Sequence, residues 1–191
     1  MKVRDSGMPA EEIWDGFFDA RRILTALGFG DSRESAVDFG CGYGTFTIAA
    51  ARLTTGTITA LDIDPTMIAA TRAKVSQFGL RNVTVIERDF VAQGSGLADT
   101  SVDWAMLFNI LHAENPLSLL REAHRVLRPG GKAGVIHWNY DASTPRGPNL
   151  SIRPRPPQCR EWLEQSGFDT SSAEISLPPF HYGIIGVRIS E

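Results

Sequence analysis

Three glycines at alternate positions follow an apolar run near residue 40, and they constrain the fold more than any other feature. The segment Val37–Gly44 has the sequence V-D-F-G-C-G-Y-G, and a helical pattern begins at Thr45. Glycine has no Cβ atom and adopts positive φ readily, so a ligand can lie against the backbone there. The unpaired amides at a helix N-terminus favour a polar or anionic group. The segment therefore predicts a ligand-binding loop between a strand and a helix.

The spacing of these glycines distinguishes two classes of cofactor. A dinucleotide-binding loop has the pattern G-x-G-x-x-G/A, which requires Gly or Ala where this chain has Thr45. A nicotinamide-dependent oxidoreductase is therefore the less favoured alternative. The pattern D-F-G-C-G-Y-G instead resembles the first motif, E/D-x-G-x-G-x-G, of class I S-adenosylmethionine-dependent methyltransferases. Among these, the chain resembles the small ubiquinone/menaquinone-methyltransferase-like enzymes (type 11).

This resemblance implies roles for the residues of the loop. The glycines are expected to cradle the methionine end of S-adenosylmethionine. The carboxylate before them is expected to order the loop and to meet the cofactor amino group, directly or through water. The cofactor-binding residues expected in this segment are Asp38, Gly40, Gly42, Tyr43 and Gly44.

A second buried strand, Thr57–Asp62, ends in a carboxylate. A carboxylate at a strand tip can accept hydrogen bonds from two ribose hydroxyls, each contributing roughly 1.5–3 kcal/mol. Asp62 is therefore the predicted ribose ligand. Asp64 precedes Pro65 and is expected only to cap the helix that follows.

A third strand, Val83–Arg88, is followed by an acidic and an aromatic residue, Asp89 and Phe90. The family resemblance implies that Asp89 accepts a hydrogen bond from the adenine amine. It also implies that Ile63 and Phe90 form apolar walls for the ring. An aspartate after a strand is often only a turn former, and this alternative stays open.

The fourth strand, Val102–Asn109, leads into a loop that by resemblance borders both the cofactor methionine and the acceptor. Asn109 is accordingly assigned to the cofactor. His112 follows and is the candidate catalytic base, because histidine titrates near neutral pH. A structural role is the alternative for this histidine. Other candidate bases are His137, His181, Tyr43, Tyr140 and Tyr182.

Alternating strand and helix patterns predict an α/β chain whose ligand site lies at the carboxyl ends of parallel strands. By resemblance the sheet closes with an antiparallel hairpin. We therefore expect a three-layer Rossmann-like sandwich with a seven-stranded, mostly parallel sheet and an antiparallel last strand. The expected single methyltransferase domain, 1–191, comprises an N-terminal helical lid (1–30), a cofactor-binding core (36–138), and a substrate-side loop, helix and closing strands (139–191).

Residues Pro9–Leu27 carry apolar side chains at helical spacing, which predicts one amphipathic helix. By resemblance such a helix lies across the cofactor and forms part of the acceptor pocket, with Phe17 or Phe18 facing in. We assign Phe18 to the acceptor. A helix that simply packs on the sheet edge explains the same pattern.

The segment Ala142–Arg160 contains four arginines and five prolines but no Asp or Glu. It follows the predicted fifth strand, Ala133–Trp138, which ends at the site, so it can hold a carboxylate or phosphate of the acceptor. Arg146 and, on the strand, His137 are the predicted acceptor contacts. A solvated, semi-rigid connector is the alternative.

Composition argues against several functional classes. A net charge of −3 gives no electrostatic reason to bind nucleic acid, and Asn109–His112 lacks the Asn/Asp-Pro-Pro-aromatic motif of amino-methylating nucleic-acid enzymes. Two cysteines provide neither a disulfide framework nor a zinc site, so no metal is expected. No secretory signal and no apolar run of roughly 20 residues are seen, so we expect a cytoplasmic protein without a membrane span.

The predicted function is methyl transfer from S-adenosylmethionine to a small-molecule acceptor, with S-adenosylhomocysteine as the product. The protein need only align the acceptor lone pair opposite the sulfur and exclude water. A macromolecular acceptor is one alternative. A non-catalytic, cofactor-binding regulatory domain is another, because the motifs indicate cofactor binding rather than methyl transfer itself. The methylated atom and the oligomeric state are open.

Overall fold

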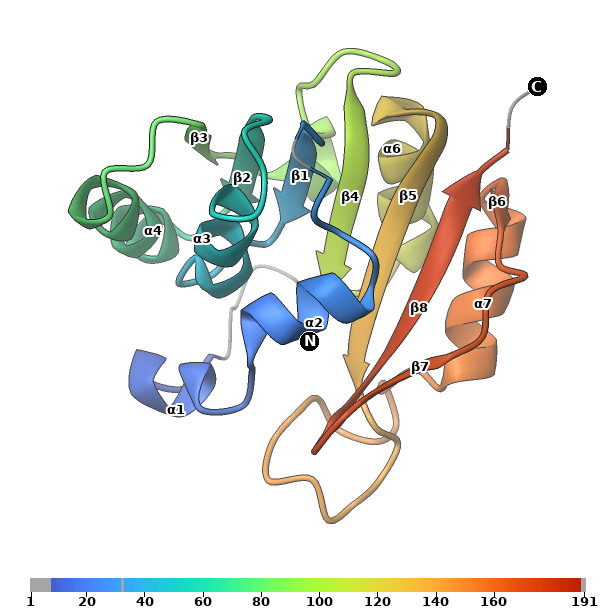
Figure 1. The fold of residues 1–191 in the computed structure, drawn as a ribbon. Coiled ribbons are helices and arrows are strands. Elements are labelled where there is room, and N and C mark those ends of the chain that lie inside the picture. Colours follow the sequence, from blue (N-terminus) through green and yellow to red (C-terminus); the bar gives the residue numbers. More distant parts are fainter. Residues whose placement is uncertain (1–7, 32, 190–191) are drawn as a thin grey trace.

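The computed structural model describes residues 8–31 and 33–189, which form a sheet with helices on both sides (Figure 1). The strands run in the order β3-β2-β1-β4-β5-β8-β6, and β7 also pairs with β8. The strands are β1 (Ala36–Phe39), β2 (Ile58–Asp62), β3 (Val83–Glu87), β4 (Val102–Phe108), β5 (Leu127–Trp138), β6 (Phe168–Asp169), β7 (Ile175–Leu177) and β8 (His181–Arg188). The helices are α1 (Glu11–Asp15), α2 (Ala20–Ala26), α3 (Thr45–Ala51), α4 (Pro65–Gln77), α5 (Phe90–Gln93), α6 (Pro116–Val126) and α7 (Pro156–Gln165).

The directions of the strands confirm a mostly parallel sheet with an antiparallel last strand. Strands β1 to β5 pair in parallel, and β8 runs antiparallel to β5. The described sheet has eight strands rather than the expected seven. The edge beside β8 is formed by two separate short strands, β6 and β7, instead of one. The Asp169 carboxylate accepts a hydrogen bond from the Ser171 amide, and this turn takes the chain off the edge between β6 and β7.

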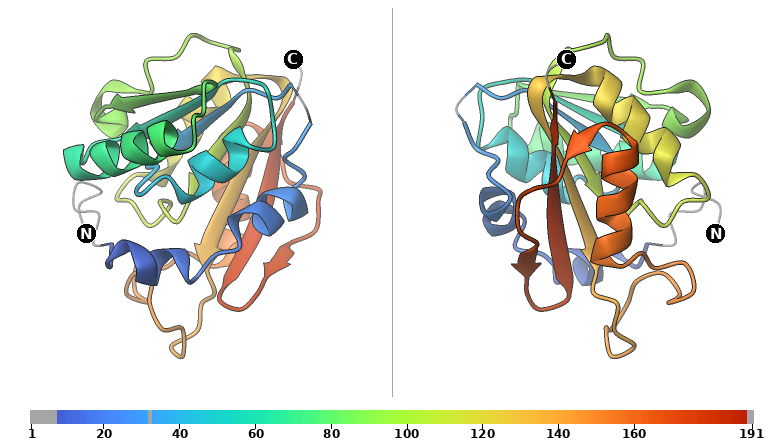
Figure 2. Two further views of the ribbon diagram at one scale, coloured as in Figure 1. Left: turned by 60° about the vertical axis from the view of Figure 1, so that its left-hand side comes forward. Right: turned by 90° about the vertical axis from the view of Figure 1, so that its right-hand side faces the viewer.

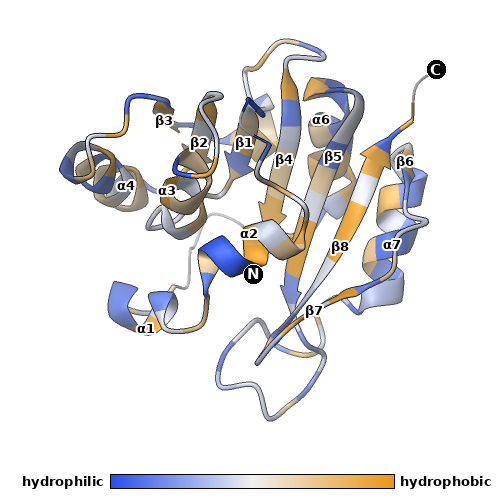
Figure 3. Cartoon of the chain, viewed as in Figure 1, coloured by the Kyte–Doolittle hydropathy of each residue, from blue (hydrophilic) through white to orange (hydrophobic). Residues whose placement is uncertain are grey.

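The helices cover the two faces of the sheet, as the edge-on view in Figure 2 shows. In β1, Val37 joins the core cluster that contains Leu120 of α6, whereas its neighbour Ala36 joins the cluster that contains Leu24 of α2. All four residues of β1 are buried, as expected for a central parallel strand with helices on both faces. Figure 3 shows hydrophobic residues along β4 and β8.

The N-terminal region departs from the prediction, because a single helix over Pro9–Leu27 is wrong. The chain forms α1 and α2 with a break at Gly16–Asp19. The Asp19 side chain accepts a hydrogen bond from the Arg22 amide, so it starts a new helix inside the apolar pattern. Helix α2 buries two residues in the core, whereas α1 buries none.

The later helix and strand boundaries follow local capping chemistry. Asp64 caps α4 by accepting a hydrogen bond of 2.8 Å from the Thr66 amide, as predicted. Strand β5 begins at Leu127 rather than Ala133, because the chain leaves α6 directly into an extended conformation. None of the helices in the described part of the chain is both long and apolar enough to cross a membrane.

Candidate cofactor and acceptor site

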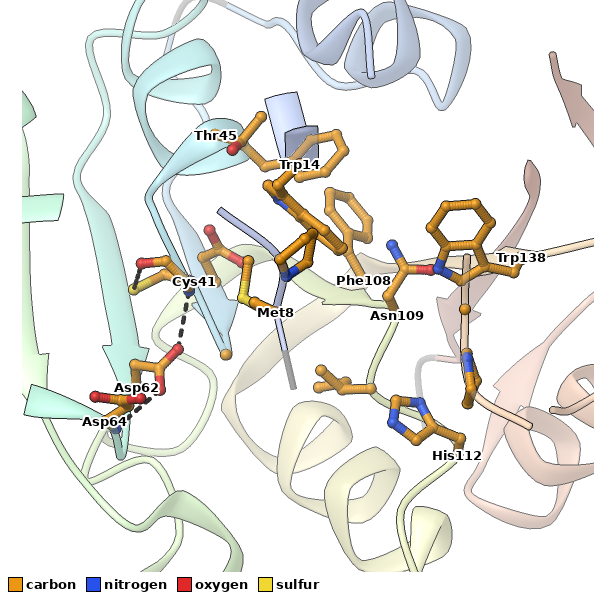
Figure 4. Close-up of a pocket in the computed structure, with 18 of the residues that line it drawn as sticks. Met8, Trp14, Cys41, Thr45, Asp62, Asp64, Phe108, Asn109, His112 and Trp138 are labelled. Carbon is orange, nitrogen blue, oxygen red and sulfur yellow. Dashed lines mark hydrogen bonds between the residues drawn. The ribbon is translucent and has the colours of Figure 1, made fainter. Parts of the chain in front are cut away.

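A cavity lies at the carboxyl ends of β1, β2 and β4, where this fold class predicts a ligand site (Figure 4). Residues before and within α1 and residues of the loop after β5 complete its wall. The predicted residues that line it are Asp38, Gly40, Gly42, Asp62, Ile63, Phe90, Asn109, His112 and Arg146. The predicted residues outside the lining are Phe18, Tyr43, Gly44, Asp89 and His137.

The three glycines of the loop differ in what lies next to them. All have positive φ, at +74° for Gly40, +54° for Gly42 and +79° for Gly44. Gly40 and Gly42 line the cavity, and a Cβ on Gly42 would lie 2.9 Å from the sulfur of Met8. A Cβ on Gly44 would instead lie 2.9 Å from Thr71 Oγ1 on α4. Gly44 is therefore required for packing between the loop and α4, and its contact with a cofactor stays a prediction.

The carboxylate of Asp62 is held at the tip of β2 by two amides. Oδ2 accepts a hydrogen bond of 2.9 Å from Gly42, and Oδ1 accepts one of 3.0 Å from Asp64. Burial raises the pKa of Asp62, while these hydrogen bonds oppose the shift. The carboxylate lines the cavity, and each oxygen keeps a second lone pair for a ligand hydroxyl.

Asp38 places a second carboxylate in the cavity wall. Its side chain is buried, and Thr47 Oγ1 donates to it at 2.6 Å. Burial raises the pKa of Asp38 to about 6, the Thr47 hydrogen bond opposes this shift, and the charge of Asp62 adds to it. A buried carboxylate with a raised pKa favours a nearby cation, because the cation stabilises its charged form.

The side predicted to hold adenine is partly assembled at the cavity. Ile63 and Phe90 line it, and the ring of Phe90 packs edge-on against Phe39 with centroids 5.5 Å apart. Asp89 is outside the lining, and its side chain accepts a hydrogen bond of 3.0 Å from the Ala92 amide at the start of α5. This is the turn-forming role, so a contact between Asp89 and adenine stays a prediction.

The N-terminal segment lies over the glycine loop through polar contacts. Tyr43, which is outside the cavity lining, donates to the carbonyl of Pro9 at 3.0 Å. Thr45 Oγ1 donates to Asp15 at 2.6 Å. Lys74 of α4 pairs with Glu11 at 2.5 Å and with Asp15 at 3.5 Å. These contacts bring Met8, Pro9 and Trp14 into the cavity wall.

The histidines differ from the sequence-based expectation. His112 lines the cavity, and its Nδ1 lies 3.4 Å from Nε2 of His137. Burial lowers the pKa of His112 to about 4, so it is neutral at pH 7, and the expectation that it titrates near neutral pH is wrong. His137 is fully buried behind it, and burial also lowers its pKa. His137 is therefore a neighbour of His112 rather than a wall of the cavity.

Phe18 also lies behind the cavity wall. Its ring centroid is 5.3 Å from that of Phe46, which lines the cavity, and 4.6 Å from that of His181, which does not. Trp138, the last residue of β5, lines the cavity in place of its neighbour His137. Successive residues of a strand point to opposite sides, which accounts for this exchange.

Asn109 is a buried polar residue of the cavity wall whose carboxamide lacks hydrogen-bond partners among the described residues. It adopts a φ of +57°, which is unusual for a residue other than glycine. It is 9% exposed, and neither Nδ2 nor Oδ1 has a hydrogen-bond partner among the described residues. Because unsatisfied buried amides are costly, this carboxamide at the cavity wall is suited to a ligand with polar groups.

The loop after β5 is tied around one of its own arginines. Arg153 is 7% exposed, and burial lowers the pKa of its guanidinium. The groups that accept hydrogen bonds from it are the carbonyls of Asn139, Asp141, Arg146 and Pro148 and the hydroxyl of Thr144. Arg153 is thus a structural centre of the loop, which leaves Arg146 to line the cavity. Within the described residues, no group of three or more His, Cys, Asp or Glu side chains could hold a metal ion.

Comparison with known proteins gives the family context. Residues 36–131 match a family model described as a methyltransferase domain. The ribosomal protein L11 methyltransferase of Methylococcus capsulatus is 38% identical over 138 residues, which cover 70% of this chain and 44% of that protein. The demethylmenaquinone methyltransferase of Staphylococcus aureus is 29% identical over 189 residues, which cover 88% of this chain and 75% of that protein. The chain spans less than half the length of the first curated relatives it matches.

Solved structures confirm the Rossmann-like methyltransferase fold. An S-adenosylmethionine-dependent methyltransferase from Aquifex aeolicus superposes with a TM-score of 0.82 at 21% identity, covering 98% of this chain and 97% of that chain. A geranyl diphosphate methyltransferase superposes with a TM-score of 0.72 at 12% identity, covering 89% of this chain and 78% of that chain. At these identities the likeness concerns the fold alone.

Proposed function

The chain belongs to the methyltransferase domain family, and from this premise we propose that it transfers the methyl group of S-adenosylmethionine to a small-molecule acceptor. The observation that carries the proposal is one cavity with two chemically different ends. Figure 4 has Asp62 and Asp64 at one side and Asn109, His112 and Trp138 at the other. The first end suits a cationic nucleoside, and the second suits an acceptor.

The residues present fit this cofactor. Gly40 and Gly42 leave the backbone open to the cavity, because positive φ and close neighbours exclude a side chain there. The raised pKa of Asp38 suits the positively charged amino group of the methionine moiety. Asp62 would hold the ribose, and Phe90, with Ile63, would wall the adenine.

The chemistry requires little from the protein beyond positioning. When bound, S-adenosylmethionine supplies a methyl carbon that is already electrophilic because it is attached to a sulfonium. Methyl transfer would form a bond from a lone pair of the acceptor to this carbon and break its bond to sulfur, and the electron pair of the broken bond would stay on the sulfur. Holding the two reactants in line and excluding water is worth up to about 7–11 kcal/mol.

We assign His112 to orientation of the acceptor. Its neutral ring can accept a hydrogen bond from an acceptor hydroxyl or amine at the cavity wall. A pKa of about 4 makes it a weak base, since the most effective catalytic pKa lies near the working pH. The proton released by the acceptor therefore passes to water or only transiently to this histidine.

Two segments that enclose the cavity support a small acceptor. The N-terminal segment and the loop after β5 both contribute to the wall, so the acceptor end is bounded by side chains such as Trp14 and Trp138. The demethylmenaquinone methyltransferase of Staphylococcus aureus, named for a small-molecule acceptor, aligns with this chain over 75% of its own length. The family match leaves the nicotinamide alternative without support.

The experiment that tests the proposal is a transfer assay with methyl-labelled S-adenosylmethionine and a library of small hydroxy, amino and carboxy compounds. We expect labelled product and S-adenosylhomocysteine to form in equal amounts. Neither should form when the acceptor is left out. A protein that binds the cofactor but labels no compound would support the non-catalytic alternative. Labelling confined to added protein or nucleic acid would contradict a small-molecule acceptor.

A further inference from the structure

Arg146 is an exposed residue of the cavity lining, and it differs from other arginines of its segment in that its side chain has no partner among the described residues. Arg153 holds the loop, and the guanidinium of Arg155 lies 3.8 Å from the centroid of the Tyr140 ring. Among the described residues, the Arg146 side chain makes no hydrogen bond or ion pair, although it lines the cavity. Guanidinium groups bind carboxylates through two parallel hydrogen bonds. Arg146 is therefore placed to receive an anionic group of a ligand.

The backbone next to Arg146 is held in place before a ligand arrives. Gly147 has a φ of +114°, and a Cβ there would lie 2.8 Å from Cγ of Trp138 and 2.8 Å from a nitrogen of Arg153. The loop thus lies directly on the Trp138 ring and on the guanidinium that ties it. This fixes the base of the Arg146 side chain beside an aromatic wall, so little loop ordering is needed on binding.

The acceptor end of the cavity combines aromatic side chains with the polar side chain of Asn109. Trp14, Phe108 and Trp138 line the cavity, and Figure 4 has the last two beside Asn109. Flat rings pack favourably against such side chains in offset or edge-on arrangements. The unpartnered carboxamide of Asn109 offers both a donor and an acceptor to a polar substituent on such a ring.

We infer that the methyl acceptor is a small aromatic carboxylate. Its ring packs among Trp14, Phe108 and Trp138, and its carboxylate pairs with Arg146. Its hydroxyl or amine lies between Asn109 and His112, which accepts the hydrogen bond assigned to it above. The inference rests on the proposed function and names the substrate class of that same site. The distribution of charge agrees with it, because the acidic residues of the wall lie at the end assigned to the cationic cofactor, while Arg146 precedes Gly147, which lies against Trp138.

Calorimetric titration of the protein saturated with S-adenosylhomocysteine tests this inference. The probes are 2-hydroxybenzoate, its uncharged counterpart 2-hydroxybenzyl alcohol, and 2-hydroxycyclohexanecarboxylate, which keeps the charge and the hydroxyl but lacks the flat ring. The variants are Arg146→Met and the matched control Arg155→Met, which removes an exposed arginine of the same segment that does not line the cavity.

We expect 2-hydroxybenzoate to bind about tenfold more tightly than the alcohol, in line with one charge-assisted pairing, and more tightly than 2-hydroxycyclohexanecarboxylate because its flat ring packs against the aromatic wall. Arg146→Met should remove the advantage over the alcohol and weaken the binding of both carboxylates, without changing the affinity for the alcohol or for S-adenosylhomocysteine, and Arg155→Met should change none of these affinities. Equal binding of the acid and the alcohol, or equal losses in the two variants, would overturn the inference and leave the proposed function standing. Failure of S-adenosylhomocysteine to bind would overturn both.

Discussion

The Asp62 carboxylate accepts a hydrogen bond of 2.9 Å from the Gly42 amide, which joins the tip of β2 to the middle of the glycine loop. The residue predicted to bind ribose therefore also fixes the loop predicted to bind methionine. The other carboxylate oxygen accepts from the Asp64 amide, so both oxygens are oriented without a ligand. Such preorganisation lowers the ordering cost of binding.

Replacing Gly44 by alanine is expected to destabilise the protein by about 2–4 kcal/mol. The left-handed φ costs about 1 kcal/mol, and the contact of the new Cβ with Thr71 adds the cost of overpacking. Gly79→Ala is the matched control, because its φ is +62° but no atom lies within 4 Å of the added Cβ. Urea unfolding measures both, and equal losses in the two variants would contradict the packing role.

Replacing Arg153 by lysine is expected to cost about 2–4 kcal/mol of unfolding free energy. Lysine cannot reproduce the fork of donors, so carbonyls inside the loop lose their partners. Arg155→Lys, at an exposed position, should change stability by less than about 0.5 kcal/mol. If thermal unfolding shows that the two variants are equally stable, Arg153 does not hold the loop.

Cofactor binding is expected to depend on pH through Asp38. Burial raises the pKa of Asp38 in the folded protein to about 6. Its contribution to the free energy of unfolding is therefore full below the ordinary pKa of 3.8 and is lost as pH rises through 6. The cationic amino group of S-adenosylmethionine favours the ionised form, so its affinity should rise roughly tenfold between pH 5 and pH 7.5. Asp38→Asn should flatten this dependence in calorimetry. An unchanged slope in the variant would assign the effect to another group.

Local patterns were sufficient for the parts of the fold and site that lie close together in the sequence. The glycine loop, the Asp62 strand tip and the Asp64 cap each depend on a few neighbouring residues. The rule that ligands bind at the carboxyl ends of parallel strands then brought Asp38, Asp62 and Asn109 to one cavity. The same rule points to the strand-end residues Phe108 and Trp138, which we did not assign.

Features that depend on distant contacts could not be predicted in this way. Met8 and Trp14 reach the cavity because polar contacts hold the N-terminal segment over the glycine loop, and no pattern near those residues indicates this. Whether His137 or Trp138 lines the cavity depends on which side of β5 faces the cavity at the end of the strand. The low pKa of His112 arises from burial, which only the packed structure reveals.

The most direct test of the account is calorimetric titration with S-adenosylmethionine, S-adenosylhomocysteine and NADH on wild type, Asp62→Ala and the control Asp169→Ala. Asp169 also accepts a backbone hydrogen bond but lies at the sheet edge, away from the cavity. Circular dichroism checks that each variant is folded.

We predict that the first two ligands bind wild type and the control, that NADH does not, and that Asp62→Ala lowers affinity about 100-fold through the loss of two charge-assisted hydrogen bonds. Binding of NADH alone, or full affinity of folded Asp62→Ala for S-adenosylhomocysteine, would show that this cavity is not an S-adenosylmethionine site built on Asp62.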